Sequence, residues 1–194
     1  MPADYTPLVE RILREATIEG ERILKIDHFL NHRIEPLFMA ELGRALAERM
    51  SSYRPDLVLT AEASGIAPAL MCAQALGVSM LYAKKYAPIN VEAPALSRIV
   101  PSPTKGGDIR LVVSARYLTA GLRVVIIDDF LANGRTALAL ADIIGDAGSE
   151  LVGAGFVVEK CFQTGRLPLE ERGIPVIALA RVERLSAGRA VMAP

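Results

Sequence analysis

The sequence has little cysteine, no tryptophan and no excess of charge of either sign. Cys72 and Cys161 are its two cysteines among 194 residues, which argues against a disulfide framework and a cysteine-ligated zinc site. We expect both thiols to be reduced and mostly buried, as is usual in the cytoplasm. Lys and Arg together number 22, as do Asp and Glu, so the chain lacks the positive excess of a nucleic-acid-binding protein.

Long apolar runs are also missing. None approaches the roughly 18 residues that a transmembrane helix needs, and the charged N-terminus lacks the apolar core of a signal peptide. We therefore expect a cytoplasmic protein with no membrane or nucleic-acid partner. Hydrophobic residues make up 52% of the chain, and its composition shows no linker or repeat, so residues 1–194 are predicted to form a single domain.

Strand-like and helix-like segments alternate along the chain, as in parallel α/β sheets. A helix is expected to begin at Thr6, with its hydroxyl as cap and Pro7 in the first turn, and another at Pro36. The stretch VPSPTKGGD is interpreted as a mobile loop, because proline and glycine punctuate it. Strands are predicted at LVLTA, VSMLYAKK, IRLVVSA, RVVII, LVGAGFVVEK and IPVIALARV, and further helices at ALMCAQAL and LPLEERG. The fold class is therefore α/β, with a central parallel sheet flanked by helices.

The segment RVVIIDDFLANGRT places two acids after a β-branched run and a small turn before a helix. Asp128 and Asp129 begin on opposite faces of a strand, yet both can line the crevice at its carboxyl end. The turn ANGRT supplies unpaired N–H groups at a helix N-terminus, where Gly134 lets a phosphate approach and the Thr136 hydroxyl can donate. Carboxylates suit hydroxyls or a divalent cation, so a sugar phosphate would satisfy both ends.

Two other interpretations of this segment stay open. A polar strand end needs no ligand, and a Walker B acid pair is a second possibility. The chain contains no G-x-x-x-x-G-K-[ST], however, which removes the usual partner of a Walker B motif.

VVIIDDFLANGRT resembles the 5-phosphoribosyl 1-pyrophosphate (PRPP) motif of the type I phosphoribosyltransferases. The resemblance implies the fold of that family, a central parallel sheet flanked by helices, with a small hood formed by the N-terminal and C-terminal segments. It implies that the acid pair holds the ribose diol, directly or through water and Mg²⁺, with the metal carried by PRPP rather than by protein ligands alone. The turn would hold the 5′-phosphate. The implied PRPP-binding residues are Asp128, Asp129, Ala132, Asn133, Gly134, Arg135 and Thr136.

Further stretches resemble the branch of this family that uses xanthine: ILKIDHFLNHRIEP, EASGIAPA, VVEKCFQTGR and LARVERL. In that branch the base is held at the positions of Leu24, Asn31 and Lys160. The residue types agree, because an ammonium only donates and suits a purine carbonyl, while an amide both donates and accepts. The ordinary alternatives are a solvated strand-end lysine at Lys160 and a turn residue at Asn31.

EASGIAPA resembles the pyrophosphate loop of the family, which implies contacts from Ser64 and Gly65. Ser64 could instead only cap the helix that follows. Lys84 and Lys85 come after the next strand and would neutralise pyrophosphate, although paired surface lysines are common.

Other positions qualify this interpretation. Ala132 stands where some relatives have an aspartate that acts as general base, so no general base is assigned. Arg135 replaces a smaller residue of the phosphate turn, and either contacts the phosphate or points outward. His28 and His32 are four residues apart but lack a third ligand, so we assign them no metal.

The implied function is transfer of the 5-phosphoribosyl group from PRPP to xanthine by a homodimer, giving xanthosine 5′-monophosphate and pyrophosphate in purine salvage. The loop through Thr104 and Lys105 resembles the flexible lid of the family. A guanine or hypoxanthine transferase remains an alternative, as does a non-catalytic regulator of the same fold that senses PRPP. Adenine is disfavoured because its amino group would meet Lys160 donor to donor.

Overall fold

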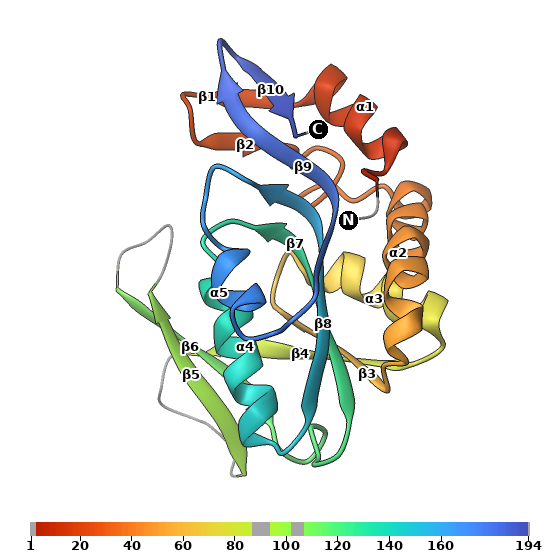
Figure 1. Ribbon diagram of the computed structural model, residues 1–194, viewed down its shortest axis with the longest axis vertical. Coiled ribbons are helices and arrows are strands. Elements are labelled where there is room, and N and C mark those ends of the chain that lie inside the picture. The colour runs from red at the N-terminus through yellow and green to blue at the C-terminus, as the bar shows by residue number, and fades with distance from the viewer. Residues whose placement is uncertain (1–2, 87–93, 102–106, 194) are drawn as a thin grey trace.

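The computed structural model describes residues 3–86, 94–101 and 107–193. An eight-stranded sheet runs through it in the order β10-β9-β8-β7-β3-β4-β6-β5 (Figure 1). Its strands are β3 (Leu57–Ala61), β4 (Ser79–Tyr86), β5 (Ala95–Pro101), β6 (Asp108–Ser114), β7 (Arg123–Leu131), β8 (Glu150–Lys160), β9 (Val176–Ser186) and β10 (Arg189–Met192). Neighbours from β9 across to β4 pair in parallel, whereas β6, β5 and β10 pair antiparallel. The predicted central parallel sheet flanked by helices is confirmed.

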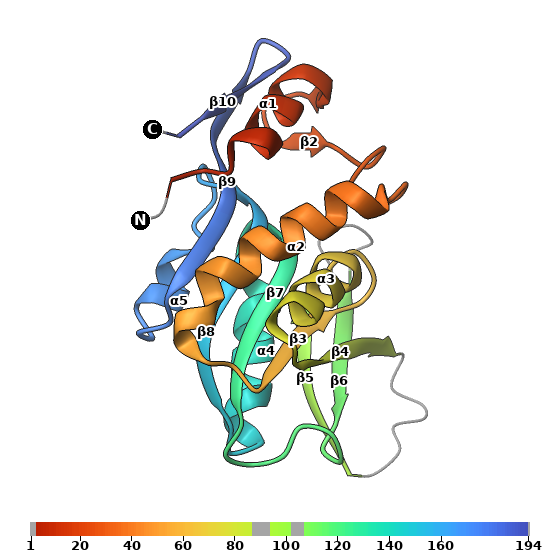
Figure 2. The same cartoon turned by 90° about the vertical axis from the view of Figure 1, so that its right-hand side faces the viewer.

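Helices cover both faces of the sheet (Figure 2). α2 (Pro36–Met50) and α3 (Ile66–Leu76) lie on one face, and α4 (Arg135–Asp146) and the short α5 (Leu167–Glu170) on the other. Both faces of the central strand β7 are buried. Val125 and Ile127 belong to the apolar cluster under α2 and α3, and Val124 and Ile126 belong to the cluster under α4. A strand buried on both faces has to be apolar throughout, which explains the run VVII.

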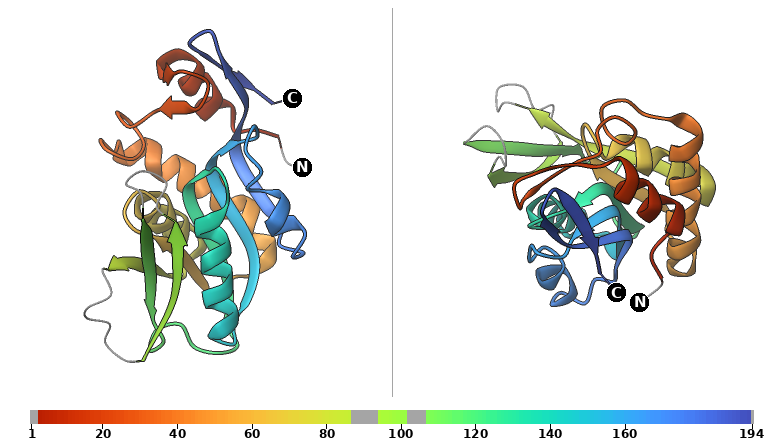
Figure 3. Two further views of the ribbon diagram at one scale, coloured as in Figure 1. Left: turned by 90° about the vertical axis from the view of Figure 1, so that its left-hand side faces the viewer. Right: turned by 90° about the horizontal axis from the view of Figure 1, so that it is seen from above.

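The two ends of the chain lie together beyond the carboxyl ends of the central strands (Figures 1 and 3). Here α1 (Thr6–Glu15) and the hairpin of β1 (Thr17–Glu19) and β2 (Ile23–Lys25) sit beside β10. The Tyr5 amide donates to the carbonyl oxygen of Leu179 at 2.6 Å, and the Asp4 carboxylate binds the Arg181 guanidinium with Oδ1 and Nε 2.9 Å apart. These bonds attach the N-terminal segment to β9.

The segment before β6 is more regular than expected. β5 was not predicted, and its last residues Val100 and Pro101, like Asp108 at the start of β6, come from the predicted loop VPSPTKGGD, whose residues 102–106 lie outside the described residues. Pro101 is compatible with a strand there because β5 is the edge of the sheet, where one side of the backbone needs no partner. The expected lid residues Thr104 and Lys105 fall outside the described residues.

Smaller corrections concern single residues. Cys72 is buried as expected, and burial raises the pKa of its thiol to about 12. Cys161 is exposed, contrary to expectation, because it directly follows the last residue of β8. α1 does begin at Thr6 with Pro7 in its first turn, but within the described chain the Thr6 hydroxyl does not cap it. None of the described helices is long and apolar enough to cross a membrane.

Candidate functional site

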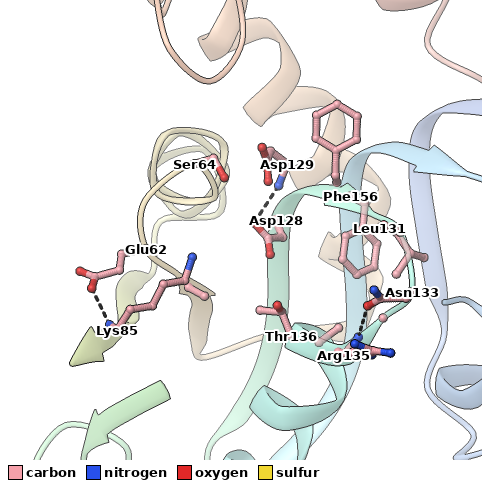
Figure 4. Close-up of a pocket in the computed structure, with 15 residues that line it drawn as sticks. Glu62, Ser64, Lys85, Asp128, Asp129, Leu131, Asn133, Arg135, Thr136 and Phe156 are labelled. Atoms are coloured by element: carbon pink, nitrogen blue, oxygen red, sulfur yellow. Dashed lines mark hydrogen bonds between the residues drawn. The ribbon is translucent and has the colours of Figure 1, made fainter. Parts of the chain in front are cut away.

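The acid pair lies in a cavity at the carboxyl end of β7. Asp128 and Asp129 line this cavity, of about 180 Å³, together with the turn at 132–136 (Figure 4). β7 continues through Leu131, so the two acids lie within the strand rather than after it. Asp129 is 6% exposed, whereas Asp128 is half-buried. Their side chains start on opposite sides of the strand and therefore meet different neighbours.

The surroundings of Asp128 disfavour the charged form of its carboxyl group. Its Oδ1 accepts the backbone N–H of Asp129 at 2.9 Å. Burial raises the pKa of Asp128 well above its usual range, and the negative charge of Asp129 raises that pKa further. A carboxylate held this way gains from a ligand that brings hydroxyl donors or positive charge.

Gly65, a predicted pyrophosphate residue, packs directly against Asp128. A Cβ at Gly65 would stand 2.2 Å from the Asp128 Oδ1 and 2.2 Å from the hydroxyl oxygen of Thr60. No larger residue fits without moving the acid. Thr60 is fully buried, and its hydroxyl has no hydrogen-bond partner in the part of the chain that the structure describes.

Asp129 connects the acid pair to the N-terminal segment. The Nδ2 of Asn31 donates to the Oδ2 of Asp129 at 2.8 Å, although the two residues are 98 positions apart. The structure therefore brings a predicted base-binding residue against a predicted PRPP-binding one. Within the described parts of the chain, the amide oxygen of Asn31 and its second N–H make no other hydrogen bond, so both can bind a ligand.

Lys160 lies at the end of β8, beside β7. Its ammonium stands 5.2 Å from the centroid of the Phe130 ring and donates to the backbone oxygen of Arg22 at 3.4 Å. Burial lowers the pKa of Lys160, and the charge of Asp129 raises it. Leu24, two residues after Arg22, is 6% exposed and belongs to the apolar core, so only a small part of its surface can meet a ligand.

The turn after β7 aims the start of α4 at the cavity. Gly134 has φ 74°, a left-handed conformation that glycine adopts without strain. The Asn133 Oδ1 accepts the backbone N–H of Arg135 at 3.1 Å, while the side chain of Arg135 is exposed. Thr136 lines the cavity from the first turn of α4 (Figure 4). Helix N-termini of this kind bind phosphate through free N–H groups and the helix dipole.

The opposite wall comes from the ends of β3 and β4. Ser64 and Lys85 line the cavity, whereas Lys84 is outside the cavity that the described residues form, because neighbours in a strand face opposite sides. Ser64 caps no helix in the described structure, since α3 has no side-chain cap. Glu62, which sequence reasoning missed, also lines the cavity and accepts the Lys85 N–H at 2.5 Å (Figure 4). Its position directly after LVLTA could have indicated it.

The chain resembles known proteins over most of its length. The family model described as "Phosphoribosyl transferase domain" matches residues 31–167. A protein of Chloroflexus aurantiacus named xanthine phosphoribosyltransferase is 53% identical over 95% of this chain and 87% of its own. One of the same name from Deinococcus deserti is 44% identical over 93% of this chain and 94% of its own. Among solved structures, adenine phosphoribosyl transferase from Trypanosoma brucei shares the fold, with TM-score 0.74 and 17% identity over 90% of this chain and 79% of its own.

Proposed function

The chain belongs to the phosphoribosyl transferase domain family, and from this membership we propose that it transfers the 5-phosphoribosyl group from PRPP to xanthine. The products are xanthosine 5′-monophosphate and pyrophosphate, a step of purine salvage. Support comes from the names of the relatives, 53% and 44% identical over nearly the whole chain. The observation that carries the proposal is the Asn31–Asp129 hydrogen bond, which joins the proposed base site to the proposed PRPP site.

PRPP would lie along the cavity from the turn to the acid pair. The turn at 132–136 lines one end, and its N–H groups, apart from that of Arg135, which donates to Asn133, suit the 5′-phosphate. Asp128 and Asp129 face the middle and suit the ribose diol, whose hydroxyls donate to carboxylates. Ser64, Gly65 and Lys85 lie on the remaining side, where a pyrophosphate group would meet a loop and an ammonium.

Xanthine would occupy the space next to Asn31 and Lys160. With one Nδ2 hydrogen given to Asp129, the Asn31 amide keeps one donor and its carbonyl oxygen for the edge of the base. The ammonium of Lys160 suits a carbonyl oxygen or an unprotonated ring nitrogen. Leu24 contributes an apolar wall from β2.

Mg²⁺ fits this site only together with its substrate. The described residues contain no group of three or more His, Cys, Asp or Glu side chains that could hold a metal. Asp128 and Asp129 supply carboxylate oxygens, which Mg²⁺ prefers, and PRPP oxygens and water would complete its coordination. When bound, the ion offsets negative charge on the pyrophosphate.

In the reaction a bond forms between a ring nitrogen of xanthine and C1 of the ribose, while the bond from C1 to the pyrophosphate oxygen breaks. Positive charge builds on the ribose ring in between, close to the carboxylates of Asp128 and Asp129. The pyrophosphate leaves with the electron pair, towards Lys85. The base gives up its ring proton to solvent, and we assign no side chain as general base.

The family resemblance extends the proposal to assembly and location. We infer a cytoplasmic homodimer that has small-molecule substrates and no nucleic-acid or membrane partner. The hood would consist of α1, β1, β2 and β10, which lie together beyond the carboxyl ends of the central strands (Figures 1 and 3). Light scattering of the purified chain, with and without PRPP, tests the dimer.

Initial rates with Mg²⁺, PRPP and each of xanthine, guanine, hypoxanthine and adenine test the function. Xanthine is expected to give the highest kcat/KM, and adenine the lowest. A chain that uses guanine or hypoxanthine better would be a different oxopurine transferase. PRPP binding without turnover, together with tight and salt-sensitive binding to DNA, would identify a regulator instead.

A further inference from the structure

The backbone of the segment that follows β8 contacts the backbone of the turn at 132–136. The Gly165 N–H donates to the carbonyl oxygen of Ala132 at 3.0 Å. A Cβ at Gly165 would stand 2.4 Å from that oxygen and 2.6 Å from the backbone nitrogen of Gly134. Conversely, a Cβ at Gly134 would stand 2.6 Å from the Gly165 oxygen. Two glycines therefore face each other with no room for a side chain between them.

Close approach, not backbone conformation, explains the glycine at 165. The φ of Gly165 lies outside the range from +20° to +160° in which side chains are disfavoured, whereas Gly134 has φ +74°. Alanine could adopt the backbone conformation of Gly165, and only its methyl group would collide. The substitution thus tests the contact alone.

A buried ion pair holds this segment in place. The guanidinium of Arg166 binds the carboxylate of Glu159 through two bonds, Nη2–Oε2 at 2.5 Å and Nε–Oε1 at 2.8 Å. It also donates to the backbone oxygen of Val176 at 2.9 Å and to Glu170 at 3.0 Å. Glu159 is 4% exposed, so the pair is shielded from water and salt. Both ends of the segment 159–166 are fixed by the same pair.

The segment is therefore a rigid support rather than a free loop. Glu159 directly precedes Lys160 and faces the opposite side of β8, so the ion pair also fixes the strand end that carries the proposed base-binding lysine. From this geometry we propose that Gly165 is a positioning residue that sets the place of the phosphate turn. The proposal rests on the proposed function, in which that turn holds the 5′-phosphate of PRPP.

A methyl group at residue 165 would push the turn and the segment apart. The backbone N–H of Gly134 would then move relative to the proposed phosphate site, and hydrogen bonds weaken steeply with such displacement. Small misplacements of binding groups cost binding and rate by an order of magnitude or more. The base site, on the other side of the acid pair, should change much less.

Calorimetric titration with ribose 5-phosphate tests the proposal on the full chain. Gly165→Ala is expected to bind it about tenfold more weakly than wild type. In steady-state assays its KM for PRPP should rise by about the same factor, with KM for xanthine within about twofold. Gly145→Ala is the matched control, because that glycine lies in α4, the helix that the turn begins, and a Cβ there meets no atom within 4 Å. It should bind as wild type does.

The possible results separate the two ideas. A wild-type chain that does not bind ribose 5-phosphate overturns the proposed function, and the inference with it. Equal affinities of wild type and Gly165→Ala, or equal rises in both KM values, overturn the inference alone. If Gly165→Ala does not fold, Arg166→Lys replaces it, since lysine keeps the charge but cannot make the paired bonds to Glu159. That variant should bind ribose 5-phosphate about threefold more weakly, and unchanged binding again overturns the inference.

Discussion

Replacing Asp128 by asparagine is expected to stabilise the unliganded protein at pH 7 and to weaken its binding of PRPP. The carboxylate is half-buried beside Asp129, and both burial and that neighbouring charge raise its pKa. The asparagine side chain in Asp128→Asn would keep an Oδ1 to accept the N–H of Asp129. The variant therefore removes a repulsion without removing a known bond.

The sign and size follow from the titration of Asp128. Its pKa is about 3.9 in the unfolded chain and higher in the folded one. Between these two values the folded chain holds a proton that the unfolded chain has lost, so wild-type stability falls as the pH rises through that window. The asparagine of the variant does not titrate, so the variant escapes this loss. We expect a gain of about 1–2 kcal/mol at pH 7, within the roughly 0.5–2 kcal/mol that a single stabilising substitution commonly gives.

Thermal unfolding from pH 4 to pH 8 measures this difference. The variant should melt about 2–8 °C above wild type at pH 7, with the gap closing as the pH falls towards 4. Asp108→Asn, at an exposed position in β6, controls for the loss of one negative charge and should show no such gap. Saturating Mg²⁺ and PRPP at about 100 Kd should stabilise wild type by about 2.7 kcal/mol, and the variant far less. A variant that is less stable than wild type at pH 7, or a gap that does not depend on pH, would refute the reasoning.

Two further predictions concern the proposed base site. Lys160→Met should lower kcat/KM for xanthine by about 10- to 100-fold, the contribution of a hydrogen bond from a charged donor, and leave KM for PRPP unchanged. Steady-state kinetics with both substrates varied measures this. An equal loss of kcat/KM for xanthine and for PRPP would contradict the assignment. Asn31→Ala removes the donor to the buried Asp129 and should lower the free energy of unfolding, measured in urea, by about 1–2 kcal/mol. It should also raise KM for xanthine. Unchanged stability would mean that the 2.8 Å hydrogen bond contributes nothing.

Local patterns in the sequence were sufficient for the parallel sheet and for the PRPP motif. The run VVII is apolar on both faces because β7 is covered by α2 and α3 on one side and α4 on the other. The acids and the turn follow at fixed distances along the same strand and helix, so their meeting in one cavity needs no long-range information. A sequence motif can therefore indicate this part of the site.

Other features depend on segments that are distant in sequence. No local pattern indicates that Asn31 donates to Asp129, because sheet packing brings together residues 98 positions apart. β5 was missed because its strand character comes from pairing with β6 at the edge of the sheet, within a stretch rich in proline. Gly165 lies in a turn that looks ordinary, and its contact with Gly134 follows only from the place of β8 beside β7.

The glycines of the site share a physical role that neither residue type nor spacing indicates. Gly65 lets a loop approach the carboxylate of Asp128, and the contact of Gly165 with Gly134 lets another segment approach the phosphate turn. A Cβ at Gly65 would collide with the side chains of Asp128 and Thr60, and a Cβ at Gly165 with the backbone of the phosphate turn, both beside the cavity of about 180 Å³. The acids can then be held near their ligand without long, flexible side chains, whose ordering would cost entropy on binding. Alanine in place of Gly65 or Gly165 should therefore affect the affinity for PRPP more than the stability of the fold, because the apolar clusters on the two faces of the sheet stay intact.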